Sequence, residues 1–459
     1  MTGAGDTIAA IATGGGVSAV GIIRLSGPRS IEIADRVFRA FNSVRMSDAA
    51  DRRLCYGELF GADGGVADIC LCTVSRGPGS YTGEDTAEMQ CHGSPAALAE
   101  GLRAVFAAGA RQALAGEFTK RAFLNGRMDL SQAEAVIDLI EAQTAEAAKN
   151  AAGQLAGAVR TKIEGIYGGL LDVIAHFFAV IDYPDEDIDA FEAESYAALL
   201  DGARRELERL LSSFERGRVV KEGVVSAIIG RPNVGKSSLL NALAGYERAI
   251  VAESAGTTRD TIEERVSVGG VLLRLIDTAG IRAALDDVEL QGIARARAAA
   301  RGARLVIAVF DGSQELTEAD RDIAALAVAA ERSVAVINKS DLPQRFDAAA
   351  PESGFGAVCR VSALTGEGLD SFGDAVASLF PEGMPAPQGE IITNERQAEA
   401  IGRAAAAIEA AAGALSAGVT HDAALSELEA ALAALGEITG VTVREDLVSR
   451  IFERFCVGK

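Results

Sequence analysis

The stretch GRPNVGKSSLLNALAG, which runs from Gly230 to Gly245, decides the fold of this chain. Its glycines let the backbone curl so that several N–H groups face phosphate oxygens. Lys236 follows at the position that reaches β- and γ-phosphates, and the hydroxyl of Ser237 follows at the position that binds Mg²⁺. The stretch therefore predicts a phosphate-binding loop that opens a helix.

The residues on either side of this loop supply the context that the motif requires. The apolar run VVSAII at 224–229 predicts a strand before the loop, and LLNAL at 239–243 predicts a helix after it. The positive end of that helix would add to the anion site. An isolated match could instead be a glycine turn in an ordinary α/β domain, so the prediction of a nucleotide site depends on three later segments.

The first of these segments is DTAG at 277–280, which ends the predicted strand 271–276. Asp277 stands where a carboxylate binds Mg²⁺ directly or through water, and the N–H of Gly280 can sense the γ-phosphate. Both residues fit a nucleoside triphosphate site that depends on Mg²⁺.

The other two segments concern the base. In NKSD at 338–341, Asp341 can accept hydrogen bonds from both N1–H and the 2-amino group of guanine. Adenine offers neither donor, so Asp341 selects GTP over ATP. Ser362 and Ala363 follow the predicted strand 358–361 and resemble the loop that backs guanine O6 in GTPases. The order of these motifs predicts a guanine nucleotide domain.

One position departs from the usual GTPase pattern. After Asp-x-x-Gly, small signalling GTPases carry a glutamine that orients the attacking water. Here that position is Ile281, whose side chain can neither donate nor accept a hydrogen bond. Carboxylates follow at Asp286, Asp287 and Glu289, although a solvated loop is the simpler interpretation of any single one. The group that positions water must therefore come from elsewhere than residue 281.

The composition limits the partners of the chain. Its 459 residues predict more than one domain, and its formal net charge is −21 with no lysine- or arginine-rich block. Because phosphate contacts dominate nucleic-acid affinity, we expect a partner to bring the basic surface if the chain acts on RNA. The sequence shows no signal peptide, no membrane-spanning run and no zinc spacing among its six cysteines. We expect a reduced cytoplasmic protein with no membrane association.

The predicted secondary structure changes along the chain. Residues 7–121 mix short predicted strands with glycine turns, and residues 131–214 are helical, with an acidic break at 182–189. The nucleotide segment follows at about 219–380, and a proline-containing linker leads into a helical C-terminal segment. We expect the two helical flanks to pack as one domain with the nucleotide domain inserted, and two independent helical domains are the alternative.

Three local features lie outside the nucleotide segment. They are the turn SYTGED at 80–85, the segment FLNGRMDL at 123–130 and the terminal RFCVGK at 454–459. On chemistry alone they are a turn, a helix N-cap and a frayed terminus. An apolar run with a cysteine at a chain end is usually docked, so the terminus is the least ordinary of the three.

Together with the nucleotide motifs, these features make the whole chain resemble the MnmE (TrmE) family, the tRNA-modifying GTPases that act on the wobble uridine. The segments that carry the resemblance are DTI at 6–8, VGIIR at 20–24, YTGED at 81–85, GEFT at 116–119, RAFLNG at 121–126, QAEA at 132–135, AGTTRD at 255–260, GEITG at 436–440 and the terminal Cys-x-Gly-Lys at 456–459. A Cys-x-Gly-Lys terminus in a chain that also contains a P-loop is highly specific to this family.

The resemblance implies a multidomain fold that combines α/β and all-α parts. An α+β tetrahydrofolate-binding and dimerisation domain would occupy residues 1–122, and a discontinuous helical domain would occupy 123–218 and 381–459. A Ras-like P-loop GTPase domain would be inserted at 219–380. The resemblance also implies a homodimer that joins an MnmG-type flavoprotein in a heterotetramer, with tRNA bound mainly through that partner.

The reaction that the family performs is also implied. The complex would attach an aminomethyl-type group at C5 of the wobble uridine, with 5-formyl- or methylene-tetrahydrofolate supplying the one-carbon unit. By the same resemblance, Arg24, Glu84, Arg127 and Lys459 would hold the folate. The family often has lysine where this chain has Arg127, so the charge is kept but the contact geometry differs. Cys456 has either a chemical role or a structural one in packing, and the sequence leaves both open.

The resemblance assigns roles around the nucleotide as well. Ser237 and Thr258 would bind Mg²⁺, and Glu289 would orient the water that Ile281 cannot. The implied nucleotide-binding residues are Asn233, Val234, Gly235, Lys236, Ser237, Ser238, Ala252, Glu253, Ser254, Ala255, Gly256, Thr257, Thr258, Asp277, Thr278, Ala279, Gly280, Asn338, Lys339, Asp341, Ser362 and Ala363.

The family also implies that GTP hydrolysis depends on K⁺. Asn233 has a side-chain amide that an ordinary turn does not require and that fits a cation ligand. Backbone carbonyls of Ala252, Ser254 and Thr257 would complete the cation site. Potassium there would offer charge to the developing negative phosphate oxygens, which is the task of an arginine finger elsewhere.

Two other functions share these nucleotide motifs. A ribosome-assembly or RNA-chaperone GTPase usually appends a basic RNA-binding module, which this acidic chain lacks. A pure signalling switch would need no folate-type N-terminal features. Folate binding separates the main prediction from both alternatives, because neither predicts it.

Overall fold

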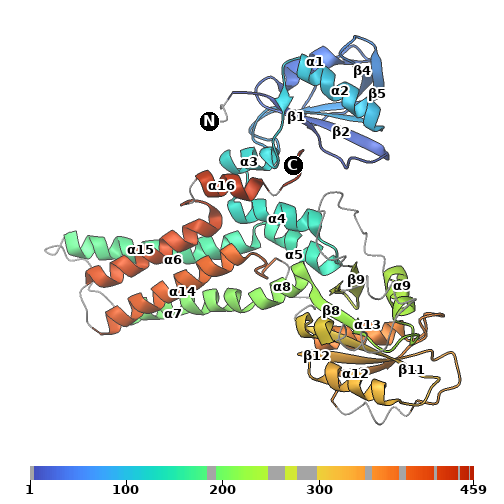
Figure 1. The fold of residues 1–459 in the computed structure, drawn as a ribbon. Coiled ribbons are helices and arrows are strands. Elements are labelled where there is room, and N and C mark those ends of the chain that lie inside the picture. The colour runs from blue at the N-terminus through green and yellow to red at the C-terminus, as the bar shows by residue number, and fades with distance from the viewer. Residues whose placement is uncertain are drawn as a thin grey trace. The chain divides into compact units, whose positions relative to one another are not determined.

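The computed structural model describes residues 5–182, 193–246, 264–276, 297–346, 354–381, 389–417, 421–442, 445–453 and 455–458. The chain divides into two compact units (Figure 1). The first consists of Met1–Ile137 and Gly436–Lys459, and the second consists of Asp138–Leu435. The predicted boundaries at residues 122, 218 and 380 stay a prediction.

The first unit contains a seven-stranded sheet in the order β3-β4-β5-β6-β2-β1-β7. Its neighbouring strands are antiparallel except for β1 and β7, which are parallel. The strands are β1 (Ile8–Ile11), β2 (Ser18–Ser26), β3 (Phe38–Ala40), β4 (Cys55–Phe60), β5 (Val66–Ser75), β6 (Thr86–Gly93) and β7 (Arg111–Gln112). The short strands predicted within residues 7–121 are therefore confirmed.

One face of this sheet is covered by α1 (Ser30–Val37) and α2 (Pro95–Ala107). Side chains alternate along the strands, so that in β4 Cys55 is buried while Tyr56 is exposed. This alternation is typical of an antiparallel sheet with one covered face. Ser94 caps α2 by accepting a hydrogen bond from the N–H of Ala97, and Pro95 follows at the first helical position.

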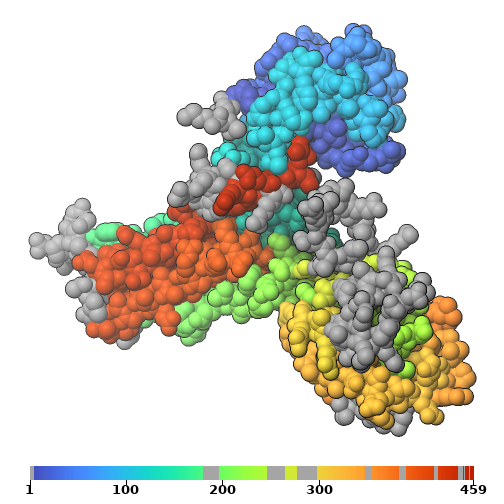
Figure 2. All heavy atoms as spheres, in the orientation of Figure 1, coloured from blue at the N-terminus to red at the C-terminus, as the bar shows by residue number. Residues whose placement is uncertain are grey.

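The remainder of the first unit brings the C-terminus onto the N-terminal segment. Helix α3 (Glu117–Leu124) is followed by α4 (Leu130–Glu141), and α16 (Glu445–Phe452) precedes the terminal residues. Phe452 and Phe455 are buried in one cluster with Met128 and Leu130. Figure 2 shows the red C-terminal residues against the cyan segment that contains α3. The terminus is therefore docked, as its apolar run predicted.

The start of α4 confirms the predicted cap in the segment 123–130. Asp129 Oδ1 accepts a hydrogen bond from the N–H of Gln132 at 2.8 Å, and Gln132 Oε1 accepts one from the N–H of Asp129 at 3.0 Å. This reciprocal pair satisfies two backbone donors that the first turn of a helix leaves free.

In the second unit, helices from both sides of the nucleotide segment pack together. They are α5 (Ala145–Leu155), α6 (Ala158–Asp182), α7 (Ala193–Ser212), α8 (Phe214–Glu222), α14 (Glu395–Ser416) and α15 (His421–Thr439). Helix α14 packs along α7, and Asn150 and Gln154 of α5 donate to the carbonyl of Ile391 on the returning segment. The nucleotide domain is therefore an insertion in a discontinuous helical domain, as predicted.

The inserted domain has a six-stranded sheet in the order β13-β12-β11-β8-β10-β9. All neighbours are parallel except β10 and β9. The elements are β8 (Val224–Ile229), α9 (Lys236–Tyr246), β9 (Glu264–Val268), β10 (Val271–Leu275), β11 (Leu305–Asp311), α12 (Glu318–Val328), β12 (Arg332–Asn338), β13 (Ala357–Arg360) and α13 (Leu369–Leu379). The strand predicted at 224–229 matches β8 to the residue, and the strands predicted at 271–276 and 358–361 correspond to β10 and β13.

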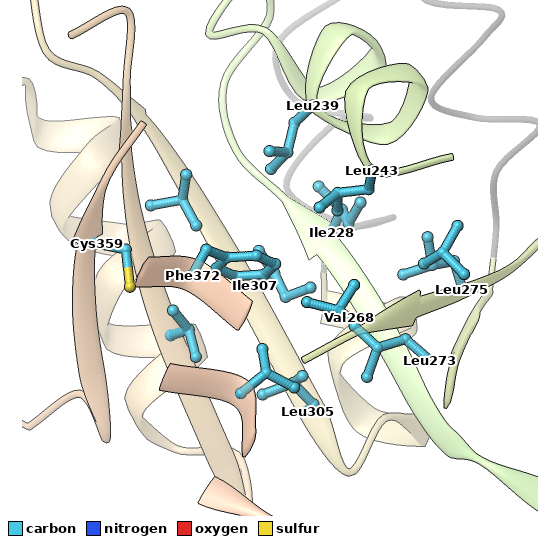
Figure 3. Packing of buried hydrophobic residues seen from close by; sticks show 14 of the residues in the cluster. Ile228, Leu239, Leu243, Val268, Leu273, Leu275, Leu305, Ile307, Cys359 and Phe372 are labelled. Carbon is cyan, nitrogen blue, oxygen red and sulfur yellow. The ribbon is translucent and has the colours of Figure 1, made fainter. Parts of the chain in front are cut away.

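Helices cover both faces of this sheet. Leu239 and Leu243 of α9 and Phe372 of α13 point toward Ile307 and other side chains of the strands (Figure 3). On the opposite face, Ile323 of α12 belongs to a second buried cluster. This doubly covered sheet explains why its central strands are apolar throughout. Among the residues that the structure describes, none of the helices has both the length and the apolar character needed to cross a membrane.

Candidate functional site

The P-loop lies between the end of β8 and the start of α9. Lys236 Nζ donates to the carbonyl oxygens of Gly230 at 2.8 Å and Arg231 at 2.7 Å, so the lysine folds back over its own loop. Burial lowers the pKa of Lys236 from its ordinary value. Gly235 has φ +98°, and a Cβ there would lie 2.1 Å from Asn338 Nδ2. Only glycine therefore fits this point of close approach.

The predicted base-binding loops meet the P-loop at one edge of the sheet. Asn338 Nδ2 donates to the carbonyl of Val234 at 2.9 Å, and Asn338 Oδ1 accepts from the N–H of Ala363 at 3.0 Å. Ser362 Oγ donates to Asp341 Oδ1 at 2.6 Å, which orients that carboxylate. The structure thus brings together three predicted loops that follow β8, β12 and β13, because the carboxyl ends of parallel strands meet at one edge.

Asp311 is a site neighbour that sequence reasoning missed. Lys339 Nζ donates to Asp311 Oδ2 at 2.6 Å and to the carbonyl of Asn233 at 3.0 Å. Burial alone would raise the pKa of Asp311, but hydrogen bonds from Lys339 and Ser313 lower it below its usual value. The sequence feature that could have identified Asp311 was its position at the end of the apolar run that forms β11, because polar residues at such strand ends often belong to a site.

Asn233 has an unusual backbone for a residue with a side chain. Its φ is +64°, in the left-handed region that asparagine tolerates better than most residues. No described residue hydrogen-bonds to its side-chain amide, so within that part of the chain the amide oxygen is available as a ligand. Several predicted positions lie outside the described residues, namely Ala252 to Thr258, Asp277 to Ile281, Asp286, Asp287, Glu289 and Lys459.

A second cluster of predicted residues lies in the first unit, around Arg24. Arg24 Nε donates to Glu88 Oε1 at 2.7 Å, and its Nη1 donates to the carbonyl of Gly458 at 3.4 Å. The guanidinium carbon lies 5.8 Å from the ring centroid of Tyr81 and 5.7 Å from that of Phe118. Arg24 therefore stands between two aromatic rings and the terminal residues of the chain.

The backbone of the terminus is held by the segment before α3. Val457 forms an antiparallel bridge with Ala115, and the N–H of Gly116 donates to the carbonyl of Cys456 at 3.3 Å. Gly458 has φ +102°, and a Cβ there would lie 2.4 Å from the carbonyl oxygen of Ile11. The glycine of Cys-x-Gly-Lys is thus needed for this docking.

The turn at 80–85 joins the remaining predicted folate residues. Glu84 Oε2 accepts from Ser26 Oγ at 2.7 Å. At the neighbouring Gly83, an added Cβ would lie 3.3 Å from Cγ of Arg127, so the Arg127 side chain runs directly past this turn. Arg24, Glu84, Arg127 and the segment before Lys459 are therefore parts of one region.

The cysteines lie in three places, and one of them, Cys359, is buried in the core of the six-stranded sheet. Cys55, Cys70, Cys72 and Cys91 are buried in the core of the seven-stranded sheet, and burial raises the pKa of Cys72. Cys456 is exposed beside the docked terminus. All six thiols are free, and the described residues contain no group of histidine, cysteine and carboxylate side chains that could hold a metal ion.

Family models match nearly the whole chain. The model described as GTP-binding protein TrmE N-terminus matches residues 7–127, and the model described as MnmE helical domain matches residues 130–456. Among solved structures, the G domain of the T. maritima FeoB iron transporter is 26% identical and matches 34% of this chain and 97% of that chain. The TM-score of that match is 0.25.

Curated relatives extend the similarity over the full length. The tRNA modification GTPase MnmE of Symbiobacterium thermophilum is 44% identical over 99% of this chain and 99% of its own length. The protein of the same name from Chloroflexus aurantiacus is 44% identical over 99% and 100%, and that from a Roseiflexus species is 43% identical over 99% and 99%. With these matches beside the docked Cys-x-Gly-Lys terminus and the inserted P-loop domain, the chain belongs to the MnmE (TrmE) family.

Proposed function

We propose that this chain is a K⁺-dependent GTPase that modifies tRNA together with an MnmG-type flavoprotein. The complex attaches an aminomethyl-type group to C5 of the wobble uridine. The coarser part of this function, GTP hydrolysis tied to tRNA modification, follows from membership of a family whose curated members are named tRNA modification GTPases. The observation that supports GTP hydrolysis in this chain is the contact between the P-loop and the loop from Asn338 to Asp341.

GTP binding is supported by the donors and acceptors at that edge of the sheet. Lys236 stands at the start of α9, where it can leave the carbonyls of Gly230 and Arg231 for the β- and γ-phosphates. The ordered carboxylate of Asp341 accepts the N1–H and 2-amino hydrogens of guanine. Ser237 and Thr258 would hold Mg²⁺, which would supply positive charge against the negative charge that develops on the phosphates.

The available amide oxygen of Asn233 fits a cation ligand, because hard cations prefer carbonyl-type oxygens. We propose that it binds K⁺ with the backbone carbonyls of Ala252, Ser254 and Thr257. The lysine–carbonyl contact from Lys339 to Asn233 holds this part of the P-loop in place. The cation would supply the charge that an arginine finger supplies in other GTPases. Glu289 orients the attacking water.

The residues of the first unit fit a folate. The pterin carries N–H donors, which suit the carboxylate of Glu84, and its flat rings suit the face of Tyr81, which lies beside Arg24. Arg24, Arg127 and Lys459 supply positive charge for the carboxylates of the glutamate tail. A tetrahydrofolate derivative bound there would supply the one-carbon unit, and these side chains bind and orient it.

We propose that two chains dimerise through their first units. The face of the seven-stranded sheet opposite α1 and α2 carries exposed apolar side chains, including Tyr56 and Ile69. Phe41 packs edge-on against Tyr56, with ring centroids 5.1 Å apart. Exposed aromatic and aliphatic groups of this kind mark protein interfaces. The net charge of −21 supports binding of tRNA mainly through the flavoprotein partner.

A cytoplasmic location fits the six free thiols, because disulfides are rare in reducing compartments. Family membership disfavours the alternative of a ribosome-assembly or RNA-chaperone GTPase, because none of the three curated relatives above is named as one.

A reconstituted reaction tests the proposal. Purified chain, an MnmG-type flavoprotein, unmodified tRNA, a folate and GTP are combined, and the tRNA nucleosides are measured by mass spectrometry. We expect a C5-modified uridine only when every component is present. Product that forms equally well without this chain or without GTP would overturn the proposal, as would a complete reaction that yields none.

A further inference from the structure

A partly buried ion network surrounds Arg121 in the first unit, and Arg121 is not among the predicted nucleotide or folate residues. Its Nη2 donates to Asp6 Oδ1 at 2.6 Å and to Glu117 Oε1 at 3.1 Å. Its Nη1 donates to the two oxygens of Glu84 at 3.2 and 3.1 Å. The Arg121 side chain is only 11% exposed, so these bonds form with little competition from water.

The contact with Glu84 orients a carboxylate that the proposed folate site depends on. A carboxylate offers about four lone-pair positions. Arg121 takes one on each oxygen, and Ser26 Oγ takes another on Oε2 at 2.7 Å. The remaining acceptor position is therefore on Oε1. Ser26 is itself fixed by Thr82 Oγ1 at 2.7 Å, so the set leaves Glu84 little rotational freedom.

Arg111 provides a comparison within the same network. It donates to Asp6 and to Glu117 but, among the described residues, not to Glu84. Together the three carboxylates and two guanidinium groups carry a net charge of −1. Loss of either arginine would leave the same charge of −2. Among the described residues Arg121 contacts Glu84 and Arg111 does not, and the Arg121 side chain is more buried, at 11% against 35% exposure.

We propose that Arg121 is a positioning residue of the folate site. It holds the Glu84 carboxylate so that Oε1 accepts an N–H of the pterin, and it does not touch the folate itself. This inference rests on the folate site of the proposed function. Lysine at this position would keep the charge but lose the planar guanidinium, whose Nη1 contacts Glu84 while its Nη2 contacts Asp6 and Glu117.

Isothermal titration calorimetry of the full-length chain with 5-formyltetrahydrofolate tests this role. We expect Arg121→Lys to weaken folate binding about tenfold, which corresponds to about 1.4 kcal/mol. The matched variant Arg111→Lys should change it by less than about twofold, because it leaves the Glu84 contact intact. GTP binding should be equal in all three proteins, because the nucleotide site lies in the second unit. Coinciding far-UV circular dichroism and thermal melting of the three proteins would show that the first unit is folded in each.

A double-mutant cycle with Glu84→Gln separates positioning from general loss of structure. If Arg121 acts through Glu84, adding Arg121→Lys to Glu84→Gln should cost much less than it costs alone. Fully additive losses, or equal losses from Arg121→Lys and Arg111→Lys, would overturn this inference alone. Absence of folate binding by the unmutated chain would overturn the proposed folate function, and this inference with it.

Discussion

Lys339 Nζ lies 3.0 Å from the main-chain carbonyl oxygen of Asn233, and this hydrogen bond ties the base-binding loop directly to the P-loop. The same ammonium binds Asp311, which is buried at the end of β11. Lys339 therefore links the base-binding loop, the P-loop and the end of β11. The loop of Asp341, which is predicted to select the base, and the loop of Asn233, which is proposed to bind the cation, are therefore joined by one hydrogen-bonded set.

The first prediction concerns the choice of base. Asp341→Asn should weaken GTP binding and strengthen xanthosine triphosphate binding, because an amide can donate to the xanthine oxygen where a carboxylate accepts from guanine. Competition binding of the two nucleotides measures the change, with the exposed acid Asp374→Asn of α13 as the matched control. Equal affinity of the unmutated chain for ATP and GTP would contradict the assignment of Asp341.

The second prediction concerns the cation. GTP hydrolysis should be faster in K⁺ than in Na⁺ at equal ionic strength, because the smaller ion fits the same ligands poorly. Asn233→Ala should remove the difference, whereas Asn241→Ala on the exposed side of α9 should keep it. Steady-state phosphate release in the two salts provides the measurement. Identical rates for the unmutated chain would rule out a potassium mechanism.

The third prediction concerns the terminus. Deleting Gly458 and Lys459 removes the lysine ammonium group that is proposed to bind the folate and the Gly458 carbonyl that accepts a hydrogen bond from Arg24. Charge-assisted bonds of this kind contribute about 1.5–3 kcal/mol each, so folate affinity measured by calorimetry should fall by about tenfold or more. GTP affinity should stay unchanged. Unaltered folate binding by the shortened chain would remove the terminus from the site.

The fourth prediction concerns acid stability. Burial alone would raise the pKa of Glu117, but hydrogen bonds from Arg111, the N–H of Leu114 and Arg121 lower it below its ordinary value of 4.5. The stabilisation from this lowered pKa is therefore present above about pH 4.5 and is lost as the pH falls through the folded-state pKa. Calorimetric melting between pH 7 and 3 should show the loss, and Glu117→Gln should lessen the pH dependence.

The exposed pair of Glu100 with Arg103 supplies the control for this experiment. Glu100→Gln should leave the pH dependence of melting nearly unchanged, because exposed pairs contribute little. A Glu117→Gln protein that keeps the full loss of stability in acid would show that other carboxylates account for it.

Local signals were sufficient to predict the nucleotide domain. The strand β8 and the loop before α9 were predictable because an apolar run, a glycine loop and a helix follow one another within a short segment. The cap at Asp129 was predictable for the same reason.

Contacts between distant parts of the chain were not predictable in this way. Arg24 and Gly458 are separated by 434 positions, and Arg121 and Glu84 by 37. No local pattern in the sequence pairs them, because their contact depends on how the sheet, α3 and the terminus pack. The family resemblance supplied Arg24 and Glu84, but Arg121 and Asp311 emerged only from the folded arrangement.

The central claim, that GTP hydrolysis by this chain drives tRNA modification, is tested most directly with Glu289→Ala. Its kcat for GTP should fall by about 10²-fold or more while GTP affinity is kept, because a group that positions water acts on the chemical step. The matched variant Asp287→Ala should lose much less. The variants are then expressed in a host strain whose own gene for the corresponding GTPase is deleted. Nucleoside mass spectrometry of its tRNA should show C5-modified wobble uridine with the unmutated chain and with Asp287→Ala, but not with Glu289→Ala. Full modification by a Glu289→Ala protein that no longer hydrolyses GTP would contradict the account.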